Sequence, residues 1–404
     1  MTTLSDPAQG SFNLSMLIND TRYRSYTFQA LALILLIFAA SMLLSNLFAN
    51  LAAQGLNISY DFLWAPAGYD INQRPIEYDS QSSNMRASVV GAINTLIVAF
   101  LACVSATIIG VIAGVLRLSD NWIIARLMSL YVEAFRNVPV LIWIIVIFTI
   151  TTSALPQPSA FRGDEPTASM LFGSFAFTNR GVFTPAPVFA AGGWAVVGVF
   201  LISIAGVFWW RARVKKVLYD TGKILPTFFP SLGILIIPTL IAYFVLGSPI
   251  TLEYPELKGF NFKGGLNIRG SLIALWFALA IYTGAFIAEN VRAGILAVSK
   301  GQTEAAAALG MRPGRIMNLV VLPQALRVII PPLISQYLNI TKNSSLAIAV
   351  GYMDLTGTLG GITLNQTGRA IECVLLLMLF YLTFSLSIAA IMNVYNNSMK
   401  LKER

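Results

Sequence analysis

The chain has 404 residues, of which 56% are hydrophobic and only 11% are charged, and its mean hydropathy is +0.71. Soluble globular proteins carry about 25% charged residues, so this composition practically excludes a soluble enzyme. Histidine is absent, which removes the commonest general base and the commonest metal ligand. Cys103 and Cys373 lie in apolar runs, which argues against a disulfide framework or a cysteine metal site. The net charge of +9 fits basic loops beside a membrane better than nucleic-acid binding.

Eight stretches of the sequence are long and apolar enough to cross a bilayer as helices, which requires about 20 residues each. The predicted fold class is therefore all-α, a polytopic membrane protein with about eight transmembrane helices. The first stretch is too long for a signal peptide and lacks a small-residue cleavage site, so we interpret it as a retained anchor. The stretches lie near residues 28–52, 88–115, 128–152, 188–210, 224–247, 271–294, 325–350 and 370–394.

The basic residues predict the orientation of these spans. With the N-terminus inside, the inner segments hold 15 basic residues and the outer segments hold 8, although the outer segments are longer. The positive-inside rule then places both termini in the cytoplasm. The outer segments 54–87, 153–187 and 248–270 are rich in Pro, Gly, Asn, Ser and Asp, which predicts surface loops.

The most informative segment follows the sixth predicted span and reads SKGQTEAAAALG from Ser299 to Gly310. Alanine is the best helix former, Ser299 and Gln302 have capping-box spacing, and Gly310 suits a left-handed C-terminal cap. A second short helix is predicted to start at Pro313 and to end before Pro323. Two such helices would form a compact knob that docks into a groove on another protein. An amphipathic loop lying on lipid is the alternative.

The residues of this segment resemble the EAA loop of ABC importer permeases. Glu304, Ala305 and Ala306 are followed by Gly310, six residues after the glutamate, and then by Leu322–Pro323. Longer matches resemble the polar amino-acid branch of that family, which includes histidine, glutamine, arginine and opine permeases. The length and extra spans are most similar to the larger permease subunit of general L-amino-acid transporters. The longer matches are Tyr131–Pro139, Tyr282–Ile295, Gly301–Gln302, Leu322–Arg327, Pro331–Pro332 and Lys342–Leu346.

The sequence departs from the family pattern at Ala293, where Gly is usual, and at Asn343, where Asp is usual. A typical permease of this branch has five spans, so the resemblance implies a type I importer core with one extra N-terminal helix and an inserted helix pair. The expected regions are 1–87 (tail, extra helix and periplasmic loop), 88–152 and 271–395 (the two parts of the core), 153–270 (the insert) and 396–404 (cytoplasmic tail), with the coupling loop at 299–323.

The resemblance implies alternating access powered from outside the chain. The implied partners are a periplasmic amino-acid-binding protein, two cytoplasmic ATPase subunits that hold ATP and magnesium, a second and different permease subunit, and the lipid of the bacterial inner membrane. No cofactor is expected in the chain itself, since Gly222–Lys223 precedes Ile224 and Val217 stands where a P-loop needs glycine. The resemblance assigns coupling to Glu304, Ala305, Ala306, Gly310, Arg312 and Pro323.

Ionisable side chains inside predicted spans are costly and are therefore candidate functional groups. Glu133 with Arg136, and Glu289 with Arg292, are each spaced three residues apart on a helix. Each pair can neutralise itself locally and act as a packing or gating ion pair near the cytoplasmic end. A direct role in substrate binding is the alternative.

Polar residues at the end of the seventh span, with Glu372 in the eighth, form the candidate substrate pathway. An amino acid needs acceptors for its ammonium and donors for its carboxylate, which suits Glu372 and Lys342 respectively. A direct pair between Lys342 and Glu372 is an equal alternative. The polar run 341–345 is expected to unwind near the membrane midplane, unless it serves only interhelical hydrogen bonding. The other candidate residues are Asn339, Asn343, Ser344 and Ser345.

Glycines 357, 360, 361 and 368 lie with Asp354 before the eighth span, and they indicate either a flexible outer gate or a plain turn. The predicted function is the permease subunit of an ATP-driven importer of L-amino acids. A secondary transporter driven by an ion gradient is the alternative, which needs no ATPase and leaves the alanine-rich segment unexplained. An intramembrane enzyme is disfavoured, because the sequence has neither histidine nor a visible paired-carboxylate or Ser–Lys arrangement.

Overall fold

The computed structural model describes residues 15–53, 55, 57–163, 165–223 and 225–399. The described residues divide between Phe62 and Leu63 into two compact units. The first contains α1 (Met16–Asn19) and α2 (Thr21–Ala53). Apolar side chains are exposed along α2, as expected of a helix whose solvent is lipid.

In the described residues, eight helices are long and apolar enough to cross a membrane. They overlap the eight stretches predicted from the sequence, although the third begins at Val140 rather than near residue 128. The prediction of a polytopic helical membrane protein is confirmed. Besides α2 they contain α3 (Asn84–Leu116), α5 (Val140–Ala154), α6 (Gly193–Thr221), α7 (Phe228–Val245), α8 (Gly270–Leu296), α11 (Leu322–Asn343) and α13 (Ala370–Met399). The span of α5 continues to Phe161, and that of α11 runs from Pro313 to Val350.

The prediction of one continuous helix over 128–152 was wrong. The chain instead forms α4 (Trp122–Asn137), breaks at Val138–Pro139, and continues as α5. Proline lacks an N–H and pushes the preceding residue out of the helical region, and Val138 is accordingly extended, with φ −111° and ψ 133°. The amphipathic α4 is therefore a separate element from the span.

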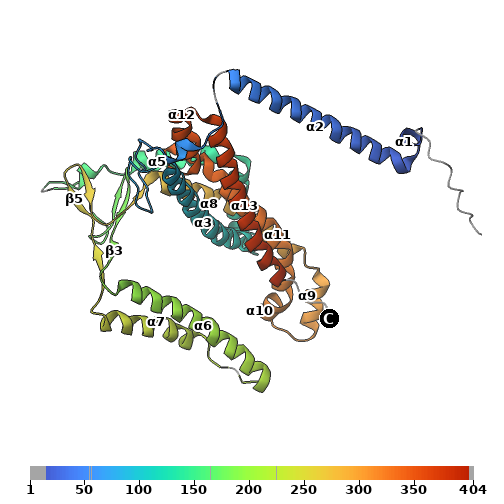
Figure 1. Cartoon of the computed structure of the whole chain (residues 1–404). Helices are drawn as coiled ribbons and strands as arrows, with labels where there is room; N and C mark the ends of the chain where they lie inside the picture. The colour runs from blue at the N-terminus through green and yellow to red at the C-terminus, as the bar shows by residue number, and fades with distance from the viewer. Residues whose placement is uncertain (1–14, 54, 56, 164, 224, 400–404) are drawn as a thin grey trace, which may run out of the picture. The chain divides into compact units, whose positions relative to one another are not determined.

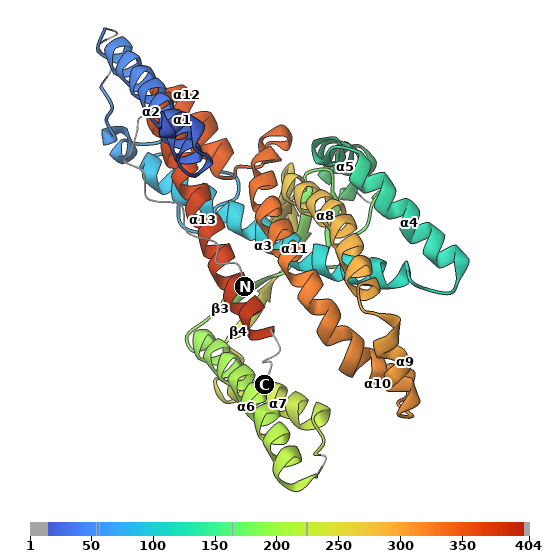
Figure 2. The ribbon, with the colours of Figure 1, turned by 90° about the vertical axis from the view of Figure 1, so that its right-hand side faces the viewer.

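The centre of the larger unit is α8, which packs against α3, α4, α5 and α11 (Figure 2). Glycines on α3 let its backbone approach α8 closely. A Cβ at Gly110 would lie 2.6 Å from Ile287, and a Cβ at Gly114 would lie 2.6 Å from the carbonyl oxygen of Ala288. Small residues at helix contacts are how membrane helices gain packing energy, so this contact needs glycine at both positions.

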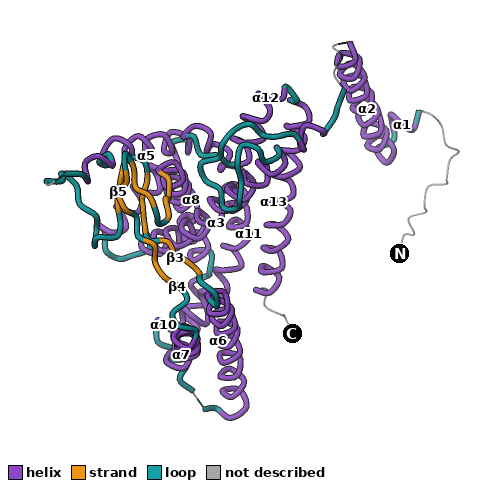
Figure 3. The backbone as a smooth tube through the Cα atoms, turned by 60° about the vertical axis from the view of Figure 1, so that its left-hand side comes forward, coloured by secondary structure: helices purple, strands orange, loops and turns teal. Residues whose placement is uncertain are grey.

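The segments predicted as surface loops over 153–187 and 248–270 contain short antiparallel strands, shown in orange in Figure 3. Two of the pairings are long-range, β2 with β7, where Val182 lies opposite Ile268, and β3 with β4. Local composition does not reveal these two pairings, whereas β1 pairs with β2 and β5 with β6 between neighbours in the chain. The sheets are β1 (Ala176–Thr178), β2 (Gly181–Thr184) and β7 (Leu266–Arg269); β3 (Ala186–Phe189) with β4 (Ile250–Glu253); and β5 (Glu256–Lys258) with β6 (Asn261–Lys263).

The inserted helices α6 and α7 pack on each other. The β3–β4 ribbon joins the start of α6 to the end of α7 (Figure 1). The last strand of the same insert, β7, leads directly into α8. The insert is thus attached to the core where α8 begins.

The remaining helical elements are short, and most of them flank α11. Figure 1 shows α9 and α10 at the opposite end of α11 from α12. The shorter helical elements are η1 (Asp61–Trp64), η2 (Pro158–Phe161), α9 (Lys300–Ala308), α10 (Pro313–Ile316), the π-helical turn η3 (Met317–Val321), the 3₁₀-helix η4 (Ser344–Val350), the π-helix η5 (Thr356–Thr363) and α12 (Leu364–Thr367).

Candidate functional site

The alanine-rich segment folds as α9 and ends in a glycine-dependent cap. Gly310 has φ +74°, a left-handed conformation that glycine adopts without steric cost. The N–H of Gly310 donates to the carbonyl of Ala307 at 2.9 Å, and the N–H of Met311 donates to that of Ala306 at 3.3 Å. This pair of hydrogen bonds is a Schellman motif. At the other end Ser299 is the N-cap, but its side chain makes no capping hydrogen bond, so the expected capping box does not form.

One side of α9 is packed and the other is free. Ala306 is buried against Ile316 and Val321, which fixes α9 to the start of the next helix. Glu304, Ala305 and Arg312 are exposed, and Pro323 is half-buried. We call the residues 299–321 the knob.

Leu309, next to Gly310, was not singled out by the sequence analysis. Its side chain is 83% exposed, although it lies outside the eight candidate spans. A large apolar side chain at the tip of a polar segment is a mark of an interaction surface. Its position next to the glycine that ends α9 could have revealed it from the sequence.

The prediction that the second short helix ends before Pro323 was wrong. The chain runs from α10 through the π-helical turn η3 into α11, with Pro323 in the first turn of α11. Proline removes one backbone hydrogen bond and its ring needs space beside the preceding turn. A π-helical turn widens the helix at that point, so the knob continues directly into a membrane span.

Glu289 of α8 is the centre of a charge cluster near the knob end of that helix. Its carboxylate is paired with Arg117 from the end of α3, with Arg292 of α8 at 2.7 Å, and with Arg136 of α4 at 3.8 Å. The Glu289 side chain is only 24% exposed. One carboxylate therefore ties three elements together at the same level of the bundle.

The expected pair between Glu133 and Arg136 does not form. The guanidinium of Arg136 instead approaches Glu289 and lies 5.2 Å from the centre of the Phe286 ring. Glu133 is exposed, and none of the ion pairs in the described part of the chain includes it. Helical spacing offered only Glu133, and the tertiary contact between α4 and α8 gives Arg136 to Glu289 instead.

The candidate substrate residues are divided between two environments. Ser344 is fully buried and donates from its hydroxyl to the carbonyl of Thr341 at 2.8 Å. Asn343 and Ser345 are half-buried, whereas Asn339 and Lys342 are exposed. The expected unwinding at 341–345 does not occur: the chain stays helical and passes at Ser344 from α-helix into the tighter 3₁₀-helix η4.

The alternative pair between Lys342 and Glu372 is wrong. Glu372 is 5% exposed and pairs with Arg369, three residues earlier, at 3.3 Å. Arg369 lies in the turn before α13, so it is much closer to Glu372 along the sequence than Lys342 is.

A buried acid that the substrate assignment left out lies between η4 and η5. Asp354 is fully buried; its carboxylate accepts hydrogen bonds from the N–H of Gly357 at 2.8 Å and from the hydroxyl of Tyr381 at 3.3 Å. Burial raises the pKa of the Asp354 carboxyl to about 6. Gly357, Gly360 and Gly361 fold into the π-helix η5 rather than a plain turn, and Gly368 ends α12 as its left-handed cap.

The segment that carries Asp354 is fastened to α3. The amide of Asn94 donates to the carbonyl of Met353 at 2.9 Å, and the N–H of Leu355 donates to the hydroxyl of Thr95 at 3.1 Å. Two adjacent polar residues inside an apolar span are the signal that could have revealed this contact, because polar side chains in membrane helices usually bond to a neighbouring element.

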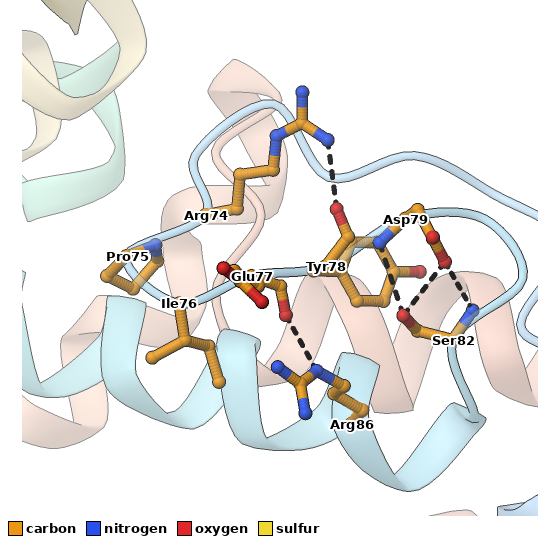
Figure 4. Close-up of a pocket in the computed structure, with 8 residues that line it drawn as sticks. All are labelled: Arg74, Pro75, Ile76, Glu77, Tyr78, Asp79, Ser82 and Arg86. Carbon is orange, nitrogen blue, oxygen red and sulfur yellow. Dashed lines mark hydrogen bonds between the residues drawn. The ribbon is translucent and has the colours of Figure 1, made fainter.

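The loop before α3 forms an open pocket of about 800 Å³, drawn in Figure 4. Arg74 donates to the carbonyl of Tyr78 at 2.9 Å, and Arg86 donates to that of Glu77 at 2.6 Å. Hydrogen bonds from Ser82 hold the pKa of the Asp79 carboxyl below its usual value. Both arginines are thus used to shape the loop.

Comparison with known proteins identifies the family. Residues 198–401 match the family described as the binding-protein-dependent transport system inner membrane component. The chain belongs to this family. It is therefore a transport subunit rather than an enzyme, and a multi-pass inner-membrane protein.

Three similar proteins support the assignment along the whole chain. The glutamate/glutamine/aspartate/asparagine transport system permease protein BztB of Rhodobacter capsulatus is 53% identical over 428 residues, which cover all of both chains. The general L-amino acid transport system permease protein AapQ of Rhizobium johnstonii is 41% identical over 95% of this chain and 94% of its own. The putative amino-acid ABC transporter permease protein YhdX of Escherichia coli is 40% identical over 94% and 95%. They confirm the resemblance to amino-acid ABC permeases.

Proposed function

We propose that the chain is a permease subunit of an ATP-driven, binding-protein-dependent importer of L-amino acids that works by alternating access. The observation that carries this proposal is the knob, whose packed face is buried on Ile316 and Val321 while Glu304, Ala305 and Leu309 face outward. The amino-acid transport named for BztB and AapQ supplies the substrate class.

The proposed partners supply the steps that the chain itself does not perform. Two cytoplasmic ATPase subunits bind ATP and magnesium, a periplasmic binding protein delivers the amino acid, and a second, different permease completes the pathway. Both termini lie in the cytoplasm, on the side of the knob. The core comprises 88–152 and 271–395, and the segment 153–270 is an insert into it.

The Glu289 cluster is proposed as the mechanical link between knob and pathway. The knob follows α8 directly, and Glu289 lies on α8 with partners on α3 and α4. A displacement of the knob by the ATPase would therefore strain a charge cluster that joins three helices. Ser344, Asn343 and Glu372 line the proposed pathway at the other end of α11 and the start of α13.

The proposal is tested by binding-protein-stimulated ATP hydrolysis of the complete transporter in proteoliposomes. Glu304→Lys reverses a charge on the exposed face of α9 and is expected to reduce stimulated hydrolysis at least 100-fold without loss of expression. Glu256→Lys makes the same change at an exposed site on β5 and should retain it. Wild-type stimulation in Glu304→Lys would contradict the proposal, and uptake that follows an ion gradient without ATP would establish the secondary transporter.

A further inference from the structure

A second pocket, of about 380 Å³, lies where the insert meets the core. Its walls come from the turn between β1 and β2, from β6, from β7 with the start of α8, and from the ends of α5 and η4. A volume of this size is within the range of small-molecule sites. The polar and charged lining residues used below are Asn72, Asn179, Arg180, Asn261, Asn267 and Arg269.

The lining of this pocket favours an anionic ligand. It contains two arginines and four asparagines, and no aspartate or glutamate is among the residues that line it. The guanidinium of Arg180 donates to the carbonyl of Phe260 at 3.3 Å, and neither arginine takes part in any ion pair of the described residues. Arginine donors are well suited to carboxylates, which they bind in a fixed, often bidentate geometry.

Two acceptors in the same pocket lack donors. The side-chain oxygens of Asn179 and Asn261 are buried and accept no hydrogen bond from the described part of the chain. A buried polar atom without a partner costs free energy, and native proteins usually satisfy such atoms with water or a ligand. An ammonium group supplies the missing donors.

We propose that this pocket binds an amino acid with an acidic side chain. The arginines take the two carboxylates, and the oxygens of Asn179 and Asn261 accept hydrogen bonds from the ammonium. This inference rests on the proposed function and assigns the insert a role in receiving the substrate. The sequence alone gives no role to the insert, because the lining residues come from separate segments between positions 72 and 351.

The pocket adjoins the segment that carries the buried acid Asp354. Gly351 lines this pocket and also a neighbouring one of about 490 Å³, whose other residues include Met353, Gly357 and Gly361. Gly351 has φ +68°, and no atom lies within 4 Å of the place where a Cβ would stand. A ligand held by the arginines is thus next to the glycine-rich segment on the core side.

Equilibrium binding of radiolabelled L-glutamate to the purified transporter complex in nanodiscs, without binding protein, tests this site. Arg269→Gln and Arg180→Gln are each expected to weaken glutamate binding about tenfold or more, the usual loss for a hydrogen bond to a charged group. Asn261→Leu is expected to weaken it several-fold. Arg162→Gln removes an arginine from the same insert outside the pocket and should leave binding unchanged.

The results distinguish failure of the pocket proposal from failure of the proposed function. Glutamate binding that is absent in the wild type, or unchanged in both arginine variants, overturns the pocket, as does an equal loss in Arg162→Gln. Loss of binding-protein stimulation with unchanged glutamate binding would make the pocket a docking surface and also overturn the inference. If the complex with Arg269→Gln does not assemble, glutamate binding is measured with Arg269→Lys, which retains the charge. Glu304→Lys should bind glutamate normally, so failure of coupling is recognised independently.

Discussion

The two ends of α8 are built in different ways. At Leu296 the chain passes through a short turn into the knob, whose helix, glycine cap and buried alanine all lie within about 20 residues of one another. At Gly270 the helix meets a sheet and a pocket assembled from segments between residues 72 and 351. The contrast teaches that a part for gripping a partner can be encoded locally, whereas a part that surrounds a ligand is encoded across the chain.

The largest effect on stability is expected at the knob end, from Glu289→Gln. This change leaves Arg117, Arg136 and Arg292 together without their counter-charge. Removing one partner of a fully buried ion pair costs about 3 kcal/mol, which is the upper bound here because the side chains of the cluster are 12% to 40% exposed. The expected result is a clear fall in the thermal unfolding temperature of the detergent-solubilised protein.

Glu133→Gln is the matched control for that change. Glu133 is exposed and takes no part in the cluster, so its replacement should alter the unfolding temperature by less than the error of the measurement. Equal effects of the two variants would mean that helical spacing, and not the contact with α8, determines the pairing.

A smaller effect on stability is expected from Gly91→Ala, at the end of the bundle opposite the knob. A Cβ at Gly91 would lie 2.1 Å from the hydroxyl of Thr358 and 2.8 Å from the carbonyl of Asp354. Overpacking of this kind costs about 2 kcal/mol and should loosen the segment 352–358, measured as faster amide hydrogen exchange there.

Gly198→Ala provides the comparison for Gly91→Ala. Gly198 lies inside α6 with no atom within 4 Å of an added Cβ, so alanine should stabilise that helix by about 1 kcal/mol. Unchanged exchange at 352–358 in Gly91→Ala would show that the segment is not held by its close approach to α3.

The same contrast between local and long-range features separates what the sequence could predict from what it could not. The apolar stretches, the glycine cap at 310 and the alanine helix depend on neighbours in the chain, so their composition was sufficient. The break at Pro139 was a local signal that the hydrophobic pattern concealed. The partner of Arg136, the pairing of β2 with β7 and the burial of Asp354 depend on residues between 27 and about 260 positions away, which no local pattern specifies.

Photo-crosslinking from two similarly exposed apolar positions tests most directly whether the ATPase binds at the knob. Leu309 on the knob and Phe260 in the insert are 83% and 87% exposed. A photoreactive residue at position 309 should capture the ATPase subunit in native membranes, and one at position 260 should not. Capture of the ATPase from 260, or a probe at 309 that only reagents on the opposite side of the membrane can reach, would contradict the claim that the knob is where the motor is attached.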